Sequence, residues 1–297
     1  MTNHKLKKAL LLTIILIKGA LIGVANIIPG VSGGTMAVSM GVYDQLIKAI
    51  TSLRRSFYQS LRFLAPYICG AVLGIAALSF IIRITLDRFP LQTAGFFIGL
   101  ILGGLPALIV KSKIRLIKPG YAGLFIFSFA LILTLALVNE PELQDSTFTF
   151  SIQSGLQLFA VGTIAAATMI IPGVSGSLIM MLLGWYNTII VQISLFIEAV
   201  FTLNTEAFVN GLIFLSLLGA GIVAGILGVA KLIEMLFRKA SKLTYAFILG
   251  LIAASPMAIL LGLSHSVFTL TNILTALPAA AAGFLLALLL SRQPAVV

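Results

Sequence analysis

Two identical seven-residue segments, 27–33 and 170–176, hold the residue types in this chain that are best suited to binding a small charged group. Each reads IIPGVSG, and at an offset of 143 residues the surrounding 24 positions share eleven identities. The proline ends an incoming helix and the glycines permit a tight turn, so each segment is predicted to break one helix and begin another. The first turn of the new helix offers free N–H groups and a positive dipole end, which favour an anion such as phosphate.

The candidate substrate-binding residues follow from this predicted helix break. They are Pro29, Gly30, Val31, Ser32, Gly33, Gly34 and Thr35 in the first copy, and Pro172, Gly173, Val174, Ser175, Gly176 and Ser177 in the second. The serine and threonine hydroxyls are expected to cap the new helix. The alternative is a plain helical hairpin turn in which the glycines serve only close packing, but two copies favour a functional pair.

Charged side chains inside apolar segments are a second group of candidates. Lys18 lies in the apolar run before the first signature, and Val161 stands at the matching position in the second half. An ionisable residue within a membrane is a functional candidate, although a lysine can also extend to the interface. Asp44, matched by Asn187, is a candidate for carrying a coupled proton or for a plain interfacial role.

The composition indicates which kind of structure must position these residues. Of 297 residues, 60% are hydrophobic and only 9% are charged, whereas a soluble domain has roughly 25% charged residues. This excludes an ordinary soluble enzyme, a disordered chain and, with a single cysteine, a disulfide scaffold. The net charge of +11 is attributed to cytoplasmic loops and to anionic lipid contact, and no nucleic-acid partner is expected.

The hydrophobic pattern predicts an all-α polytopic membrane protein built from two repeats, 1–145 and 146–297. Each repeat is expected to hold a helical hairpin broken at its signature and then three spans of about 20 residues. The first repeat has its hairpin at 9–50 and spans at 63–82, 91–110 and 121–138. The second has its hairpin at 152–197 and spans at 208–230, 243–262 and 268–290. The hairpins are interpreted as re-entrant; ten full spans is the alternative.

The basic clusters orient this arrangement. Placing them in the cytoplasm puts both termini there and gives the second repeat a topology inverted relative to the first, as in many secondary transporters. They occupy 5–8, 48–62, 111–118 and 231–242, whereas 140–145 is acidic. Arg83 and Arg88 are then external bases that could capture a phosphate, or alternatively lie at the interface or pair with Asp87.

The residues needed for catalysis do not gather near the signatures. A lipid phosphatase needs a nucleophile or base with a positioned acid, and neither His4 nor His265 lies near a signature. The sequence has no metal-ligand spacing and no GxxxxGK(S/T) motif for ATP. We therefore expect a transporter and not an enzyme, with no cofactor and no metal. The alternatives are a transporter or channel for another anion and, third, a membrane lipid phosphatase.

The twin signature, with Gly41–Tyr43 and Gly184–Tyr186 ten residues on, resembles a bacterial membrane family formerly catalogued as a domain of unknown function. That family is the polyprenyl-phosphate (undecaprenyl-phosphate) translocase family of the PopT type. The resemblance covers essentially the whole chain, with Ser177 in place of the second glycine, Gly34.

The resemblance implies a flippase of the bacterial cytoplasmic membrane. It would return undecaprenyl phosphate from the outer to the inner leaflet for cell-envelope synthesis, with this lipid and membrane lipids as partners. By alternating access the headgroup would pass from the external arginines, between the two signatures, and out beside Lys111, Lys113 or Lys239. Lipid chain length, coupling ion, direction in the cell and oligomeric state stay open, and self-association is compatible with this plan.

Overall fold

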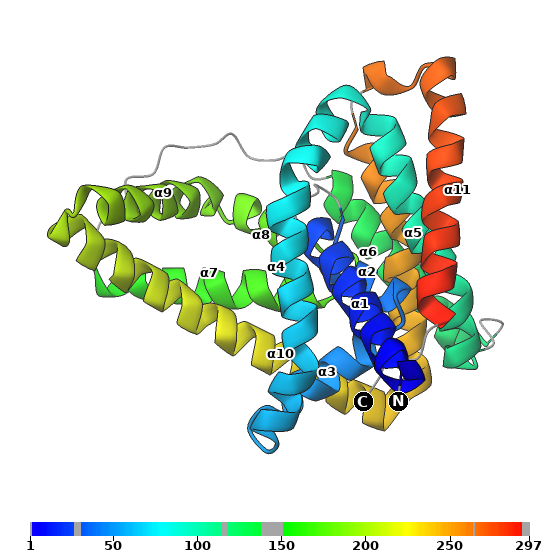
Figure 1. Cartoon of the computed structure of the whole chain (residues 1–297), viewed down its shortest axis with the longest axis horizontal. Coiled ribbons are helices and arrows are strands. Elements are labelled where there is room, and N and C mark those ends of the chain that lie inside the picture. The colour runs from blue at the N-terminus through cyan, green and yellow to red at the C-terminus, as the bar shows by residue number, and fades with distance from the viewer. Residues whose placement is uncertain (1, 27–30, 115–117, 138–150, 264, 293–297) are drawn as a thin grey trace. The chain divides into compact units, whose positions relative to one another are not determined.

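The computed structural model of the chain describes residues 2–26, 31–114, 118–137, 151–263 and 265–292 (Figure 1). The described part is helical and contains no β-strand. The first half holds α1 (Thr2–Ala25), α2 (Gly33–Ser39), α3 (Tyr43–Ser52), α4 (Phe57–Arg88), α5 (Pro90–Ser112) and α6 (Pro119–Leu137). The second holds α7 (Ile152–Ile170), α8 (Gly176–Leu182), α9 (Tyr186–Thr202), α10 (Thr205–Leu261), a 3-10 turn (His265–Val267) and α11 (Leu270–Arg292).

Six of the described helices are long and apolar enough to cross a membrane by length and composition. They are α4 (over Phe57–Ala77), α5, α6, α7, α10 and α11. Many large apolar side chains on these helices are exposed to the surroundings, as lipid-facing surfaces require. The predicted all-helical polytopic membrane protein is confirmed at this level.

The predicted spans correspond to described helices, with differences at two places. α10 covers the predicted spans 208–230 and 243–262 except for the last residue of the second, and the non-helical angles of Ala240 (φ −144°, ψ 49°) form a kink between them. α7, predicted as one leg of a hairpin, is itself long enough to span. The predicted repeat boundary at 145 lies outside the described residues.

The chain forms two compact units. The first contains residues 1–138, 171–174 and 230–297, and the second contains 139–170 and 175–229. These units differ from the two sequence repeats because helices of one repeat pack on helices of the other within the first unit. There, Gly99 of α5 lies against Ala280 of α11, and Gly250 of α10 lies against Phe125 of α6.

One helix crossing occurs twice, once in each unit, with matching glycines. In the first unit α1 crosses α4, where a Cβ on Gly70 would collide with the Leu16 carbonyl oxygen. In the second unit α7 crosses α10, where a Cβ on Gly221 would collide with the Phe159 carbonyl oxygen. Leu16 and Phe159 are 143 residues apart and the two glycines 151 apart, so the duplication extends to packing. Such small-residue contacts are typical of membrane helices.

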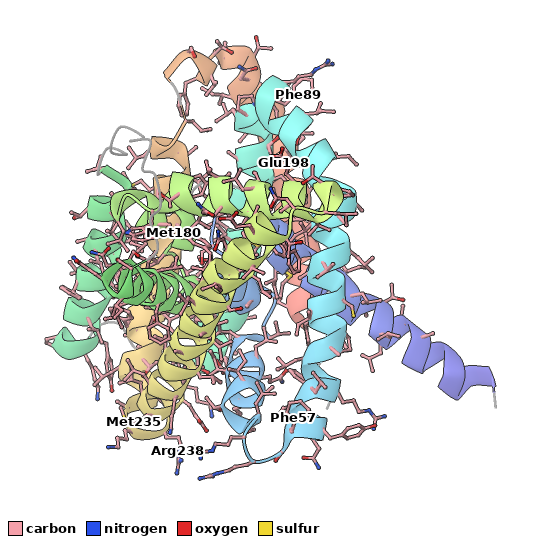
Figure 2. The ribbon with its side chains drawn as sticks, turned by 90° about the vertical axis from the view of Figure 1, so that its left-hand side faces the viewer. Phe57, Phe89, Met180, Glu198, Met235 and Arg238 are labelled. Atoms are coloured by element: carbon pink, nitrogen blue, oxygen red, sulfur yellow. The ribbon has the colours of Figure 1, made fainter. Side chains whose placement is uncertain are left out.

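Basic segments of the first unit gather toward one end of the long helix α4. Figure 2 labels Phe57, at the start of α4, and Arg238 of α10 at this end, and Phe89, just after α4, at the other. α3 lies at the same end as Phe57, and α1 begins there (Figure 1). The basic clusters at 48–62 and 231–242 therefore lie toward the same end of α4, and Arg88 lies at the other end of this helix.

The second unit has its own apolar core. Leu158 and Val161 of α7, Ile189 of α9, and Phe214 and Leu218 of α10 are all buried and in contact. Met180, labelled in Figure 2, packs against this cluster from α8. This core holds α8, the short helix that follows the second signature, against α7.

Candidate functional site

The two signatures fold into the same succession of backbone elements. In each copy a long helix ends, a short helix begins at the last glycine of IIPGVSG, and a third helix begins at the tyrosine of Gly-x-Tyr. The short helices start at Gly33 and Gly176, which are 143 residues apart, and the third helices start at Tyr43 and Tyr186. The predicted helix break is therefore present in both copies.

A left-handed glycine ends the short helix in each copy. Gly41 has φ +72° and Gly184 has φ +74°. In the first copy the Val42 N–H donates to the Ala37 carbonyl at 3.0 Å, and in the second the Trp185 N–H donates to the Met180 carbonyl at 2.9 Å. This is a common way to stop a helix, and it explains why Gly-x-Tyr follows each signature at the same distance.

The two signatures are in direct contact within the first compact unit. The backbone N–H of Gly173 donates a hydrogen bond of 2.7 Å to the Thr35 hydroxyl oxygen, and Thr35 is fully buried. Gly173 has φ +85°, and a Cβ there would lie 3.1 Å from the Leu251 carbonyl oxygen, so the position requires glycine. The expected helix-capping role of Thr35 is wrong, since its hydroxyl bonds the second signature.

Asn26 supplies the first copy with a contact that the sequence analysis missed. The Gly33 N–H donates to the Asn26 side-chain oxygen at 3.3 Å, while the Asn26 amide donates to the Ile22 carbonyl at 3.0 Å. The expectation of a free N–H at the start of the short helix is thus wrong at Gly33. The sequence feature that could have indicated this contact is the Asn26 amide at the end of an apolar run. The second copy has Met169 at the matching position.

Two serine hydroxyls, one at each end of α2, are buried without a partner among the described residues. Ser32 occupies the N-cap position of α2 but makes no side-chain cap bond, so its predicted capping role is wrong. Ser32 is 4% exposed and Ser39 is 2% exposed, and neither hydroxyl has a hydrogen-bond partner in the described part of the chain. A buried unpaired hydroxyl costs roughly 1–3 kcal/mol, so two within one short segment mark it as a place where a polar ligand would be stabilised.

The remaining signature residues are partly described. Val31, Gly33 and Gly34 are buried, as are Pro172, Val174 and Gly176, while Ser175 is half-buried. Within the second unit a Cβ on Gly176 would collide with the Met169 side chain and lie 2.9 Å from the Ala165 carbonyl oxygen. Pro29 and Gly30 and the side chain of Ser177 lie outside what the structure describes.

Lys18 points into the protein and not toward an aqueous surface. It is 2% exposed, on α1 next to Gly19, whose Cβ would collide with the Tyr67 carbonyl oxygen of α4. The close α1–α4 crossing therefore encloses it. An ionisable side chain enclosed within an apolar membrane helix is a functional candidate, and Lys18 stays one.

Asp44 joins three helices of the first unit. Its Oδ2 atom lies 2.7 Å from Lys111 Nζ of α5 and accepts a hydrogen bond of 2.8 Å from the Tyr245 hydroxyl of α10. These groups line a cavity of about 140 Å³. Tyr245 was not among the predicted site residues, because nothing in an apolar span singles out one tyrosine. Only the fold brings it to Asp44, 201 residues away.

Arg88 takes no part in the Asp44 contacts. Arg88 is exposed in the last turn of α4 and makes no hydrogen bond or ion pair to another described residue. The side chains of Arg83 and Asp87 lie outside the described part, so their predicted pairing is not addressed. Lys113 and Lys239 are exposed. Among the described residues no group of three or more His, Cys, Asp or Glu residues could hold a metal ion.

Comparison with known proteins now identifies the family. A protein-family model described as undecaprenyl phosphate translocase-like matches residues 22–261 and 194–296, which include both signatures and the Asp44 cluster. The chain belongs to this family.

Two relatives support the assignment to this translocase-like family over most of the chain. One, from Staphylococcus aureus strain NCTC 8325, is named a polyprenyl-phosphate transporter and is 31% identical over 255 residues, covering 85% of this chain and 87% of its own. Another of the same name, from Vibrio cholerae serotype O1, is 29% identical over 252 residues, covering 79% and 73%. No solved structure matches the chain.

Proposed function

We propose that this protein transports a polyprenyl phosphate of the undecaprenyl phosphate class across the membrane, and that the phosphate binds between the two signatures. The observation that carries the proposal is the hydrogen bond from Gly173 to Thr35. It joins two segments 138 residues apart, each a broken helix, and broken helices inside a membrane are tolerated only where protein or a cavity satisfies the backbone. The names of the relatives supply the substrate class.

The chemistry of the first signature suits a phosphate headgroup. The Ser32 and Ser39 hydroxyls are buried donors without a partner among the described residues. Lys18, buried on the helix leading into the signature, is the proposed source of positive charge. The backbone of residues 29–35 and 172–177 completes the proposed site, with Ser175 and Ser177 as its hydroxyls from the second copy. The apolar tail stays in the lipid, so only the headgroup has to be shielded.

The proposed topology is an inverted repeat with both termini in the cytoplasm of a bacterium. Its support is the repeated α1–α4 and α7–α10 crossing, and the gathering of basic clusters toward one end of α4. The two signature hairpins are proposed to be re-entrant. Alternating access would then carry the headgroup from the outer leaflet, where Arg83 and Arg88 receive it, to the inner leaflet beside Lys111, Lys113 or Lys239. Release there supplies the carrier for cell-envelope synthesis.

Asp44 is the proposed proton carrier. It is ion-paired to Lys111 and accepts the Tyr245 hydrogen bond, so protonation would weaken contacts among three helices at once. A proton gradient could therefore bias the two conformations that alternating access requires.

Topology can be tested by labelling single cysteines from outside intact cells. With Cys69 replaced by serine, a membrane-impermeant maleimide should label Glu206→Cys, in the first turn of α10, but not Lys113→Cys, which follows α5. The inverted arrangement would be contradicted if both cysteines were labelled equally fast from outside. It would also be contradicted if neither were labelled until the cells were permeabilised.

The function itself can be tested in proteoliposomes with fluorescent undecaprenyl phosphate and a membrane-impermeant quencher. Wild-type protein should make inner-leaflet lipid accessible to the quencher. Thr35→Val, which removes the hydrogen bond to Gly173, should slow transport about tenfold, whereas Thr134→Val should not. Thr134 is the matched control, since its hydroxyl donates to the Ala130 carbonyl within its own helix at an exposed position. Absence of transport by well-reconstituted wild type at several pH values would favour another anion.

A further inference from the structure

The cavity beside Asp44 is a second polar site, formed by α2, α3, α5, α10 and α11 of the first unit and lined by no residue of the two seven-residue signatures. Its volume is about 140 Å³, and its polar lining includes Tyr43, Asp44, Lys111, Tyr245 and Ser291. A water needs roughly 10–15 Å³ of such space, so the cavity has room for a phosphate group and a few waters.

The donors in this cavity converge on one negatively charged oxygen. Lys111 Nζ and the Tyr245 hydroxyl lie 2.7 and 2.8 Å from the same atom, Asp44 Oδ2. An ammonium and a hydroxyl directed at one anionic oxygen are the donors that a phosphate oxygen would also accept. The carboxylate therefore occupies a position that fits the oxygen of a phosphate monoester.

The ion pair is accessible enough to be exchanged. The Lys111 side chain is 48% exposed and that of Asp44 is 22% exposed. Ion pairs that reach solvent contribute little to stability, so a dianionic phosphate could take the Lys111 ammonium from the carboxylate. The lining also has apolar side chains, Val38, Leu108 and Ile248, which suit the first isoprene unit attached to a phosphate.

The second half of the chain lacks this cluster. At the offset of 143, Asp44 is matched by Asn187, and at the offset of 151, Lys111 is matched by Gly262. A site that follows the duplication would appear twice, whereas this one belongs to a single end of the protein. Its helix α3 lies at the end of α4 where Phe57 and Arg238 are found (Figures 1 and 2).

We propose that the Asp44–Lys111–Tyr245 cavity is a release site for phosphate monoesters, in which the Asp44 carboxylate is a built-in competitor of the headgroup. This rests on the proposed function. A phosphate arriving from the signatures takes the two donors from Asp44. Asp44 then recovers them as the phosphate leaves, which prevents tight retention and favours release at the cytoplasmic end.

Binding to the purified protein in detergent tests this proposal. Geranyl phosphate, a short isoprenyl monophosphate, and inorganic phosphate would be titrated calorimetrically against wild type and variants. Wild type should bind two geranyl phosphates. Lys111→Met should lose one of them or weaken it about tenfold or more, and Tyr245→Phe should weaken it several-fold. Asp44→Asn should tighten it about tenfold, because the competitor is gone.

Lys118→Met is the matched control, since Lys118 is exposed just before α6 and does not line the cavity. It should bind like wild type. A single binding event that is unchanged in Lys111→Met, with no tightening in Asp44→Asn, would overturn the release site. If Asp44→Asn does not elute as a monodisperse species, Lys111→Met and Tyr245→Phe decide the test between them.

The two ligands separate the sources of the phosphate. Equal affinity for inorganic and geranyl phosphate in the Lys111-dependent site would assign it to free phosphate and overturn its role in lipid release. Selective binding of geranyl phosphate supports that role. Failure of the proposed function would appear differently, as wild type that binds at this site but moves no labelled lipid in proteoliposomes.

Discussion

The two signature copies share a backbone but differ in their side-chain chemistry. Both break a helix, restart it at a glycine and stop it at a left-handed glycine, Gly41 or Gly184. Three polar side chains that make contacts in the first copy are replaced in the second. Asn26, Thr35 and Asp44 are matched in the second copy by Met169, Leu178 and Asn187, respectively.

The duplication preserved the backbone geometry of the signatures but not their side-chain chemistry. The turns and glycine contacts recur because a broken helix in a membrane needs the same backbone geometry wherever it occurs. The side-chain chemistry is free to diverge, because one phosphate needs one set of donors and each side of the membrane makes different demands. In the contact between the copies, the first supplies the Thr35 hydroxyl oxygen and the second supplies the Gly173 N–H.

The largest expected effect is on the crossing that both halves share. Gly70→Ala and Gly221→Ala each place a methyl group against a backbone carbonyl, so each should lower the free energy of unfolding by about 1–3 kcal/mol, toward the upper value. Gly219→Ala should be neutral or stabilising, since nothing lies within 4 Å of a Cβ there. Thermal unfolding in detergent measures all three, and a harmless Gly221→Ala would break the correspondence between the halves.

The next effect distinguishes the contact between signatures from an ordinary turn. Gly173→Ala and Gly184→Ala both force alanine to a positive φ, at a cost of about 1–2 kcal/mol each. Gly173→Ala should also reduce transport, because its methyl group would crowd the Leu251 carbonyl at 3.1 Å and displace the partner of Thr35. Gly184→Ala, which meets nothing within 4 Å, should keep transport per folded molecule. Equal transport by both would argue against a shared site.

A smaller effect comes from exchanging the residues that face the two short helices. Asn26→Met removes the acceptor of the Gly33 N–H and should lower stability by about 1 kcal/mol and slow transport several-fold. Met169→Asn introduces an amide beside Gly176 that the second copy does not use, so transport should change little. Similar losses of transport in both variants would show that the first copy has no special role.

The smallest effect concerns the hydroxyl of Ser39. Ser39→Ala removes a buried group with no partner among the described residues, so stability should stay the same or rise slightly. Ser128→Ala removes a fully buried hydroxyl that donates to the Phe125 carbonyl at 3.0 Å and should cost about 1 kcal/mol. Transport should fall only in Ser39→Ala once corrected for folded protein, and no fall would remove Ser39 from the site.

The sequence predicted the features that depend on local backbone chemistry. Proline and glycine in IIPGVSG forced the helix breaks, and runs of about 20 apolar residues located the spans. The family followed from the same twin motif. Asp44 and Lys111 were each singled out by their charge, but their ion pair was not predicted.

The missed features depend on contacts between distant segments. Tyr245 reaches Asp44 across 201 residues, and Thr35 reaches Gly173 across 138, so neither partner can be read from spacing. Ser32 occupies the capping position that its residue type predicts, yet its hydroxyl makes no cap bond. Gly33, which would have been a free donor, is instead bonded to Asn26.

The central claim is that both signatures contact one phosphate. A polyprenyl phosphate with a photoreactive group beside its phosphate, crosslinked in reconstituted protein and mapped by mass spectrometry, tests this most directly. The account predicts labelled peptides from both 31–39 and 171–176, with competition by unlabelled lipid and reduced labelling of both in Thr35→Val. Competed labelling confined to one signature, or to neither, would contradict it.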